Sequence, residues 1–342
     1  MRIAVLLPQV PFARGGAEIF AETLVTQLRA QGHEADLVTI PFKWYPGERV
    51  LTQALLWRLA DLTEADGRPI ELVVATKFPS YCVRHPRKVV WLLHQFRQAY
   101  ELDRTPLGQF SESARDRALR RQVQRLDRTC LSEARRLFAT SRNVAARLER
   151  STGLQAEVMP HPPQPLDYRC EEFGDFVLSV GRLDRAKRVD LLLEALAAAP
   201  ELRAVVCGEG PDRKRLEELA RRRGLGGRVA FPGRVGEEEL ASLYARCLAV
   251  YYAPFDEDFG MVPYEAFLSG KPVVTTQDAG GPLEVVAHRR TGLVCEPRPE
   301  ALARACAWLR EHVEEARALG QAGQKIAQGL TWERAIERLL ES

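Results

Sequence analysis

The sequence contains no apolar run close to the ~20 residues that a membrane-spanning helix needs. Its seven cysteines are odd in number and show no C-x-x-C spacing, which argues against a zinc site or a disulfide framework and favours a reducing compartment. The first eight residues carry one charge and too few apolar side chains for a signal peptide, so they predict a buried first strand. Short repeats and low-complexity tracts are also missing. These absences favour a soluble cytoplasmic protein.

The charge is unevenly distributed along the chain. Residues 1–170 hold 25 Lys and Arg against 18 Asp and Glu, a net +7, whereas residues 171–342 hold 24 against 28, a net −4. The excess is concentrated in residues 115–150, where 11 arginines accompany four acids. Such a segment suits an anionic membrane surface or an anionic acceptor, and it is equally typical of a solvated helix in an arginine-rich protein. Nucleic acid is disfavoured because no basic groove interleaved with aromatic residues is evident.

Short β-branched runs alternate with segments of helical period along the whole chain, the pattern of parallel sheets flanked by helices. The expected strands are 3–7, 35–40, 72–76, 89–93, 137–140 and 156–159 in the first half, and 176–180, 204–207, 228–231, 248–253, 272–275 and 292–295 in the second. Four prolines in residues 160–165 can continue neither a helix nor a central strand, so they predict a linker. We therefore expect an α/β protein with two doubly wound, Rossmann-like domains and a cleft between them.

The predicted boundaries follow from this division. Residues 1–160 form an N-terminal domain, 161–170 a proline-rich linker and 171–328 a C-terminal domain. Residues 329–342 form a last helix with Thr331 as its expected N-cap, and we expect this helix to pack back on the N-terminal domain.

The most informative segment is 256–265, in which Glu257 and Glu265 lie on either side of a Phe-Gly turn. A strand, a glycine-containing loop and a short helix that starts near Gly260 are expected here, with Glu265 about one and a half turns inside the helix. Free amides at a helix N-terminus suit phosphate, and two separated carboxylates can each accept hydrogen bonds from a different polyol. A sugar joined through a diphosphate to a ribose has that shape.

A second motif follows the strand 176–180. Gly181 ends the strand, and Arg182 and Lys187 lie in the loop and the helix start after it. Two cations at the carboxyl end of a parallel strand can hold a diphosphate, whereas the alternative is a solvated loop in an arginine-rich chain.

Three further positions stand at expected strand ends. Gly15 and Gly16 precede a helix and suit an anion, although they lack the G-x-G-x-x-G pattern of dinucleotide binders and are also typical of a tight turn. His94 ends the strand 89–93, where a lone histidine is usually structural or exposed. The segment 77–81 follows another strand and is a candidate for acceptor binding.

Together these segments resemble the retaining family-4 glycosyltransferases. The E-x7-E signature is formed by Glu257 and Glu265, and G-R-x-x-x-x-K by residues 181–187; G-G-A-E at 15–18 and G-G-P-x-E-x-V at 280–286 also match. The residue after the lysine is Arg188, where the family usually has glycine. The resemblance implies the GT-B architecture, with two facing domains and the nucleotide-sugar held mainly by the second.

The resemblance also implies site roles. Glu257 would hold donor-sugar hydroxyls, Arg182 and Lys187 the diphosphate, and His94 would face the sugar, so these four form the predicted catalytic set. The predicted donor-binding set is Gly15, Gly16, Gly181, Gly208, Glu209, Arg234, Val235, Phe259, Gly260, Met261, Val262 and Glu265, with Glu265 on the ribose hydroxyls.

The implied reaction is transfer of a sugar from a UDP- or GDP-sugar to an acceptor hydroxyl with retention at the anomeric carbon. No cofactor and no metal are expected, although Asp256 and Asp258 form a D-x-D. The expected acceptor is a cell-envelope or exopolysaccharide glycan or its lipid carrier, reached from the cytoplasm or from the inner face of the cell membrane.

Three alternatives remain open at this stage. A nucleotide-sugar epimerase on the same architecture would release altered sugar without any acceptor. A phosphorylase would need phosphate and usually a lysine-bound pyridoxal cofactor. A non-enzymatic bilobal sugar-binding protein would bind ligand without consuming a donor, and would normally carry a signal peptide.

Overall fold

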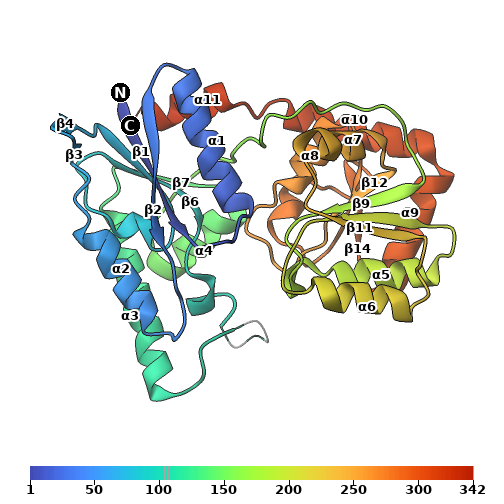
Figure 1. Ribbon diagram of the computed structural model, residues 1–342, viewed down its shortest axis with the longest axis horizontal. Helices are drawn as coiled ribbons and strands as arrows, with labels where there is room; N and C mark the ends of the chain where they lie inside the picture. The colour runs from blue at the N-terminus through green and yellow to red at the C-terminus, as the bar shows by residue number, and fades with distance from the viewer. Residues whose placement is uncertain (104, 106–107, 342) are drawn as a thin grey trace. The chain divides into compact units, whose positions relative to one another are not determined.

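The computed structural model describes residues 1–103, 105 and 108–341. The chain forms two compact units (Figure 1). Unit 1 comprises Met1–Gln164 together with the C-terminal segment from Thr331, and unit 2 comprises Pro165–Leu330. The division between them falls within the proline-rich segment.

Unit 1 is built on a six-stranded parallel sheet with the order β2-β1-β5-β6-β7-β8. Its strands are β1 (Arg2–Gln9), β2 (Glu34–Pro41), β5 (Leu72–Lys77), β6 (Lys88–His94), β7 (Arg136–Ala139) and β8 (Glu157–Val158). All six strands expected in this half are confirmed, with ends shifted by at most two residues. A short antiparallel hairpin, β3 (Glu64–Ala65) with β4 (Arg68–Pro69), was not expected. It turns at Asp66 and Gly67, both of which have positive φ, as a two-residue hairpin requires.

Helices cover both faces of this sheet. They are α1 (Gly16–Ala30), α2 (Arg49–Leu59), α3 (Ala114–Ser132), α4 (Arg142–Thr152) and α11 (Trp332–Leu340), with 3-10 turns η1 (Ser80–Cys82) and η2 (Arg97–Ala99). Successive residues of a strand point to opposite faces, and accordingly Val5 joins a core with α1 and α11 while Leu6 joins a core with α2, α3 and α4. The sheet is therefore doubly wound.

Helix α11 lies far along the sequence from the rest of unit 1. Its Trp332 is almost fully buried, contacts the ring of Phe20 at 6.1 Å between centroids, and donates a hydrogen bond from Nε1 to the carbonyl of Pro163 at 3.0 Å. Thr331 is its N-cap, as expected, since the hydroxyl accepts from the amide of Arg334. The final helix is thus part of the core of unit 1.

Unit 2 repeats the design with the strand order β11-β10-β9-β12-β13-β14. The strands are β9 (Phe176–Val180), β10 (Arg203–Cys207), β11 (Val229–Gly233), β12 (Ala249–Tyr251), β13 (Val273–Thr276) and β14 (Gly292–Cys295). The helices are α5 (Val189–Ala198), α6 (Arg213–Arg222), α7 (Glu237–Arg246), α8 (Val262–Leu268), α9 (Pro299–Glu311) and α10 (Val313–Ala327), with 3-10 turns η3 (Arg185–Lys187) and η4 (Gly281–Glu284). All six strands expected in this half are also confirmed, within two residues at each end.

The strand order of unit 2 sets the place of its site. Numbered along the chain, its six strands run 3-2-1-4-5-6, so the order reverses between β9 and β12. In open α/β sheets, ligands bind outside the carboxyl ends of the two strands at such a switch point. In unit 1 the corresponding reversal lies between β1 and β5.

Helix α8 is held against α10 by two glycines of α10. A Cβ atom on Gly320 would lie 1.9 Å from the carbonyl oxygen of Gly270, and one on Gly323 would lie 2.2 Å from the ring of Phe267. The close approach of the two helices therefore requires glycine at both positions.

We predict that Gly320→Ala destabilises the protein by about 1–3 kcal/mol, the usual cost of overpacking. The clash outweighs the gain of about 1 kcal/mol that alanine brings to a helix interior. Denaturant unfolding of the variant measures this difference. Gly226→Ala is the control, because a Cβ there meets nothing within 4 Å. A Gly320→Ala protein as stable as the wild type would contradict the close packing of α8 on α10.

Candidate active site

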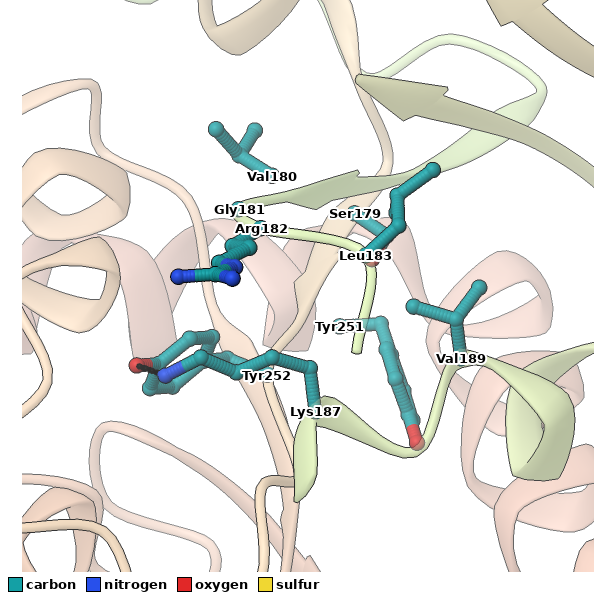
Figure 2. A pocket seen from close by; sticks show the side chains of 9 residues that line it. All are labelled: Ser179, Val180, Gly181, Arg182, Leu183, Lys187, Val189, Tyr251 and Tyr252. Atoms are coloured by element: carbon teal, nitrogen blue, oxygen red, sulfur yellow. Dashed lines mark hydrogen bonds between the residues drawn. The ribbon is translucent and has the colours of Figure 1, made fainter. Parts of the chain in front are cut away.

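A pocket opens at the switch point of unit 2. It lies beside the loop that follows β9, and its lining consists of Ser179, Val180, Gly181, Arg182, Leu183, Lys187, Val189, Tyr251 and Tyr252 (Figure 2). The lining thus comes from the carboxyl end of β9, the loop and helix start that follow it, and the carboxyl end of β12; the sheet order reverses between these two strands. The fold places this pocket where a doubly wound sheet ordinarily binds its ligand.

Lys187 and Glu257 form an ion pair beside this pocket. Nζ of Lys187 contacts Oε2 of Glu257 and lies 3.3 Å from the hydroxyl of Tyr252, whose ring centroid is 5.4 Å away. Both charged side chains are largely buried, with exposed fractions of 23% and 18%. Burial alone would lower the pKa of Lys187, but the carboxylate of Glu257 outweighs it and holds that pKa above its usual value. Lys187 is therefore a fixed cation.

Arg182 is the second cation of this group. Its side chain is 53% exposed, and its Nε lies 3.9 Å from the carboxylate of Asp184, a distance too long for a hydrogen bond. In Figure 2 the side chains of Arg182 and Lys187 extend toward the same side. Gly181, Arg182 and Lys187 thus line one pocket, and Glu257 is joined to it by its ion pair with Lys187. Tyr252 lines the same pocket and was not expected from the sequence.

Glu265 lies in the first turn of α8. The helix begins at Val262 after the N-cap Met261, so the expected start near Gly260 was two residues early. Glu265 therefore lies closer to the N-terminus of the helix than expected. Gly260 lies before the helix with φ +82°, and Phe259 is buried beside Tyr264. The early expectation arose because a glycine at positive φ cannot be told from a helix start by sequence alone.

A tyrosine on a neighbouring helix holds the carboxylate of Glu265. The hydroxyl of Tyr244 on α7 donates to Oε2 at 2.6 Å. Burial raises the pKa of Glu265, and this hydrogen bond partly offsets the shift. The sequence carried no signal for Tyr244, because its contact depends on how α7 and α8 pack.

The two glycines of the G-G-P segment pack against the backbone of residues 256–259. A Cβ on Gly280 would lie 2.6 Å from the carbonyl oxygen of Glu257, and one on Gly281 would lie 2.5 Å from that of Asp258. The amide of Glu257 donates to the carbonyl of Ala279 at 2.8 Å. These glycines permit the close backbone contact that fixes Glu257.

The turns after β10 and β11 lie next to the β9 loop. The amide of Gly208 donates to the carbonyl of Gly233 at 2.7 Å, and the carbonyl of Glu209 accepts from the amide of Leu183. The carboxylate of Glu209 is paired with Arg213. Arg234 is exposed, whereas Val235 packs partly against the core. Gly208 and Glu209 thus contact the β9 loop directly, but Glu209 already has a cationic partner.

At the switch point of unit 1, Gly15 is the N-cap of α1. Its amide donates to the carboxylate of Glu18 at 2.8 Å, and Glu18 pairs with Lys77 at 3.3 Å. Gly16 is the first residue of the helix. The sequence predicted amides that are available to an anion here, whereas the structure shows that Glu18 occupies the amide of Gly15.

His94 lies at the end of β6, beside Lys77 of β5 in the sheet register. Its Nδ1 is 2.7 Å from the carbonyl of Gln95, so Nδ1 carries the proton and Nε2 carries the lone pair in the neutral ring. Burial, and next the charge of Lys77, lowers the pKa of His94 to about 4. His94 is therefore neutral at pH 7.

Known proteins resemble this chain in sequence and in fold. Residues 171–326 match the family described as "Glycosyl transferases group 1". The matched segment lies within unit 2. The chain is 32% identical over 155 residues to the human alpha-1,3/1,6-mannosyltransferase ALG2, a match that covers 40% of this chain and 37% of that protein. The match thus spans little more than a third of that relative's length.

Two solved structures resemble the chain over nearly its whole length. The sucrose-phosphate synthase of Thermosynechococcus elongatus is 23% identical with a TM-score of 0.77, covering 100% of this chain and 98% of that one. Alr3699/HepE of Anabaena, solved in complex with UDP-glucose, is 19% identical with a TM-score of 0.70, covering 99% and 98%. These likenesses establish the GT-B fold, with two Rossmann-like domains.

We predict that His94 titrates near pH 4 instead of near the value of about 6.5 for a free histidine. Because the unfolded state would bind its proton at the higher pH, the stability contributed by the neutral ring is complete above about pH 6.5 and is lost as the pH falls toward 4. The imidazole NMR signal that disappears in His94→Gln identifies the residue. A midpoint near 6.5 for that signal would contradict the buried, neutral ring.

Proposed function

We propose that this protein is a retaining glycosyltransferase that moves a sugar from a UDP- or GDP-sugar to an acceptor hydroxyl. The observation that carries the proposal is the group of Arg182, Lys187 and Glu257 at the switch point of unit 2. Two cations suit a diphosphate, and a carboxylate suits the hydroxyls of the attached sugar. The complex of the Anabaena relative with UDP-glucose supports a nucleotide-sugar as the ligand.

The ion pair of Lys187 and Glu257 suggests how the site would hold its substrate, since Nζ of Lys187 contacts Oε2 of Glu257. A diphosphate would give Lys187 a second anionic partner and would leave Glu257 able to accept hydrogen bonds from the sugar. Glu265, oriented by Tyr244, would accept hydrogen bonds from the ribose hydroxyls. Each carboxylate of the E-x7-E pair would then serve a different part of the donor.

We propose that retention arises by attack of the acceptor on the same face of the sugar that the diphosphate leaves. In this route the bond from the anomeric carbon to the diphosphate oxygen breaks, the bond to the acceptor oxygen forms, and the departing phosphate takes the acceptor's proton. Negative charge develops on the leaving diphosphate, so Arg182 and Lys187 stabilise the transition state more than the ground state. His94 is neutral at pH 7, so its ring can exchange hydrogen bonds but supplies no positive charge.

No metal is needed in this proposal, because the two cations supply the positive charge that a metal would bring. The carboxylate of Asp258 is largely buried, and the backbone of Asp256 is held by a hydrogen bond to the carbonyl of Asp278. Across residues 1–103, 105 and 108–341, His, Cys, Asp and Glu form no group of three or more that could hold a metal ion. In this proposal the two aspartates of the D-x-D stabilise the loop and bind no metal.

We further propose that the acceptor belongs to a cell-envelope or exopolysaccharide glycan and is met at the inner face of the membrane. No helix in the described part of the chain could cross a bilayer. Arg121, Arg125 and Arg128 lie on the exposed face of α3, opposite its buried side chains. Their spacing of four and three residues places them in one stripe.

The neighbouring helix α2 adds an apolar surface. Leu55, Leu56 and Leu59 are 53%, 45% and 72% exposed, on the face opposite the buried Ala54 and Trp57. Helices α2 and α3 contact each other and run side by side in Figure 1. Leucines that insert between lipids and arginines that contact phosphates would together favour an anionic membrane.

The donor prediction concerns ligand-induced stabilisation. Thermal unfolding is measured with UDP, GDP and ADP and their common sugars, with and without EDTA. We expect one nucleotide series to raise Tm irrespective of EDTA, and Lys187→Ala and Glu265→Ala to lose that shift. We also expect Lys187→Ala to lower turnover roughly 100-fold or more, because the loss of one group that stabilises transition-state charge typically has an effect of that size. Stabilisation by none of these nucleotides would contradict the donor site, while sugar release without any acceptor would favour an epimerase.

The membrane prediction compares vesicles of neutral phosphatidylcholine with vesicles that contain phosphatidylglycerol. We expect co-sedimentation with the anionic vesicles only, and weakening at high salt. Leu55→Ser/Leu59→Ser and Arg121→Gln/Arg125→Gln should each reduce binding by roughly tenfold or more, since each buried apolar group and each arginine contributes on the order of 1 kcal/mol. Arg221→Gln/Arg222→Gln, which removes two exposed arginines of α6, is the matched control. Equal losses in this control would point to net charge instead of the α2–α3 surface.

A further inference from the structure

Arg188 has an unusual backbone for an arginine. It lies between Lys187 and the first residue of α5, and it adopts the left-handed conformation with φ +50° and ψ +41°. Side chains with a Cβ disfavour this region, which is why glycine is common there. An arginine at such a position indicates that its side chain makes contacts that compensate for the backbone.

The guanidinium of Arg188 meets acceptors from two other loops. Nε donates to the carbonyl of Ala253 at 2.8 Å, and Nη2 lies 2.9 Å from the carbonyl of Pro254, both just after β12. After β13, Nη1 and Nη2 each lie 2.8 Å from one carboxylate oxygen of Asp278, and Nη2 also lies 2.7 Å from the hydroxyl of Thr276. The planar fork of an arginine suits this set of acceptors, because its five N–H donors diverge in fixed directions.

The loop after β12 carries Glu257, and the loop after β13 supports it. The amides of Asp256 and Glu257 donate to the carbonyls of Asp278 and Ala279 at 2.9 and 2.8 Å. Arg188 also contacts the carbonyl of Pro254, three residues before Glu257. Arg188 thus holds both the stretch that leads into Glu257 and the stretch that supports it.

The same residue controls the other half of the ion pair, because Lys187 precedes it directly in the chain. The carbonyl of Arg188 accepts a hydrogen bond from the hydroxyl of Tyr251 at 2.7 Å, so its backbone is anchored to the end of β12 as well. Burial would raise the pKa of Asp278, but the hydrogen bonds from Arg188 and Thr276 hold that pKa below its usual value. Asp278 is therefore an anionic partner for Arg188.

We infer that Arg188 is a positioning residue that sets the geometry between Lys187 and Glu257 and does not itself bind the donor. The inference rests on the proposed function, in which these two side chains serve the diphosphate and the sugar. Loss of the Arg188 contacts should therefore move the carboxylate of Glu257, which would hold the sugar, relative to the ammonium of Lys187, which would hold the diphosphate. Binding of a nucleoside diphosphate without sugar should then change little, whereas sugar transfer should fall.

Three variants test this inference. Arg188→Lys keeps the charge and loses the fork, and Asp278→Asn removes the charge on the other side of the contact. Arg188→Gly removes the side chain at a backbone conformation that glycine tolerates, so its effect does not come from backbone strain. Arg203→Ala is the control, since Arg203 forms an exposed ion pair with Asp175 away from these loops.

The measurements are the affinities for UDP and GDP, those for UDP-glucose and GDP-mannose, and kcat and KM for transfer. We expect nucleoside diphosphate affinity to stay within about threefold of wild type, while kcat falls roughly 100-fold in Arg188→Gly, the scale of a 1 Å misplacement in an active site. The kcat values of Arg188→Lys and Asp278→Asn should lie between those of Arg188→Gly and the wild type. A double variant, Arg188→Lys/Asp278→Asn, should lose less than the product of the two single losses.

Two outcomes would overturn the inference while the proposed function stands. One is wild-type kcat in Arg188→Gly and Arg188→Lys. The other is an equal loss of nucleoside diphosphate affinity, sugar-nucleotide affinity and Tm, which would show a purely structural role. A wild-type protein that binds none of the four nucleotides and transfers no sugar would instead remove the proposed function, and the inference with it.

Discussion

The reversal of strand order beside β9 is the constraint on which the functional part of unit 2 depends. Crossover helices leave a parallel sheet on opposite faces on the two sides of this point, so the loops after β9 and β12 leave space for a pocket at the edge of the sheet. Farther along the chain the two loops meet, since the amide of Phe255 donates to the carbonyl of Ala186 at 2.7 Å. The ion pair of Lys187 and Glu257 also joins these two loops. A pocket and a pair of opposite charges therefore arise at the same place from topology and from local sequence.

Arg188 and the G-G-P glycines fix the loops that carry Lys187 and Glu257. Loops that diverge have few apolar contacts to order them, and a charged side chain on such a loop would sample many positions. Here Gly280 and Gly281 let two backbones meet, and the guanidinium of Arg188 ties the same backbones to the β9 loop. The charges at the switch point are thereby held by hydrogen bonds and not by the hydrophobic core.

The sequence predicted the twelve main strands because each is a short β-branched run with clear punctuation, and fully buried parallel strands show that pattern strongly. The family resemblance assigned Arg182, Lys187 and Glu257 to one donor site; in the structure Lys187 pairs with Glu257, and Arg182 and Lys187 line the same pocket. It did not predict the β3–β4 hairpin, whose two-residue strands are too short for any periodicity. Contacts such as that of Tyr244 with Glu265 join different helices, and no local pattern encodes them.

The two switch points differ in their electrostatics, and this difference bears on where an anionic donor would be held. In unit 1, Lys77 is compensated by Glu18, the amide of Gly15 is occupied by the same carboxylate, and His94 is neutral at pH 7. In unit 2, Lys187 is likewise paired with one carboxylate, that of Glu257, and Arg182 adds a second cation whose side chain is 53% exposed. The basic excess of the N-terminal half is concentrated in residues 115–150, which include the exposed arginines of α3. We therefore expect attraction for a diphosphate to be stronger at the switch point of unit 2, where Arg182 and Lys187 line one pocket.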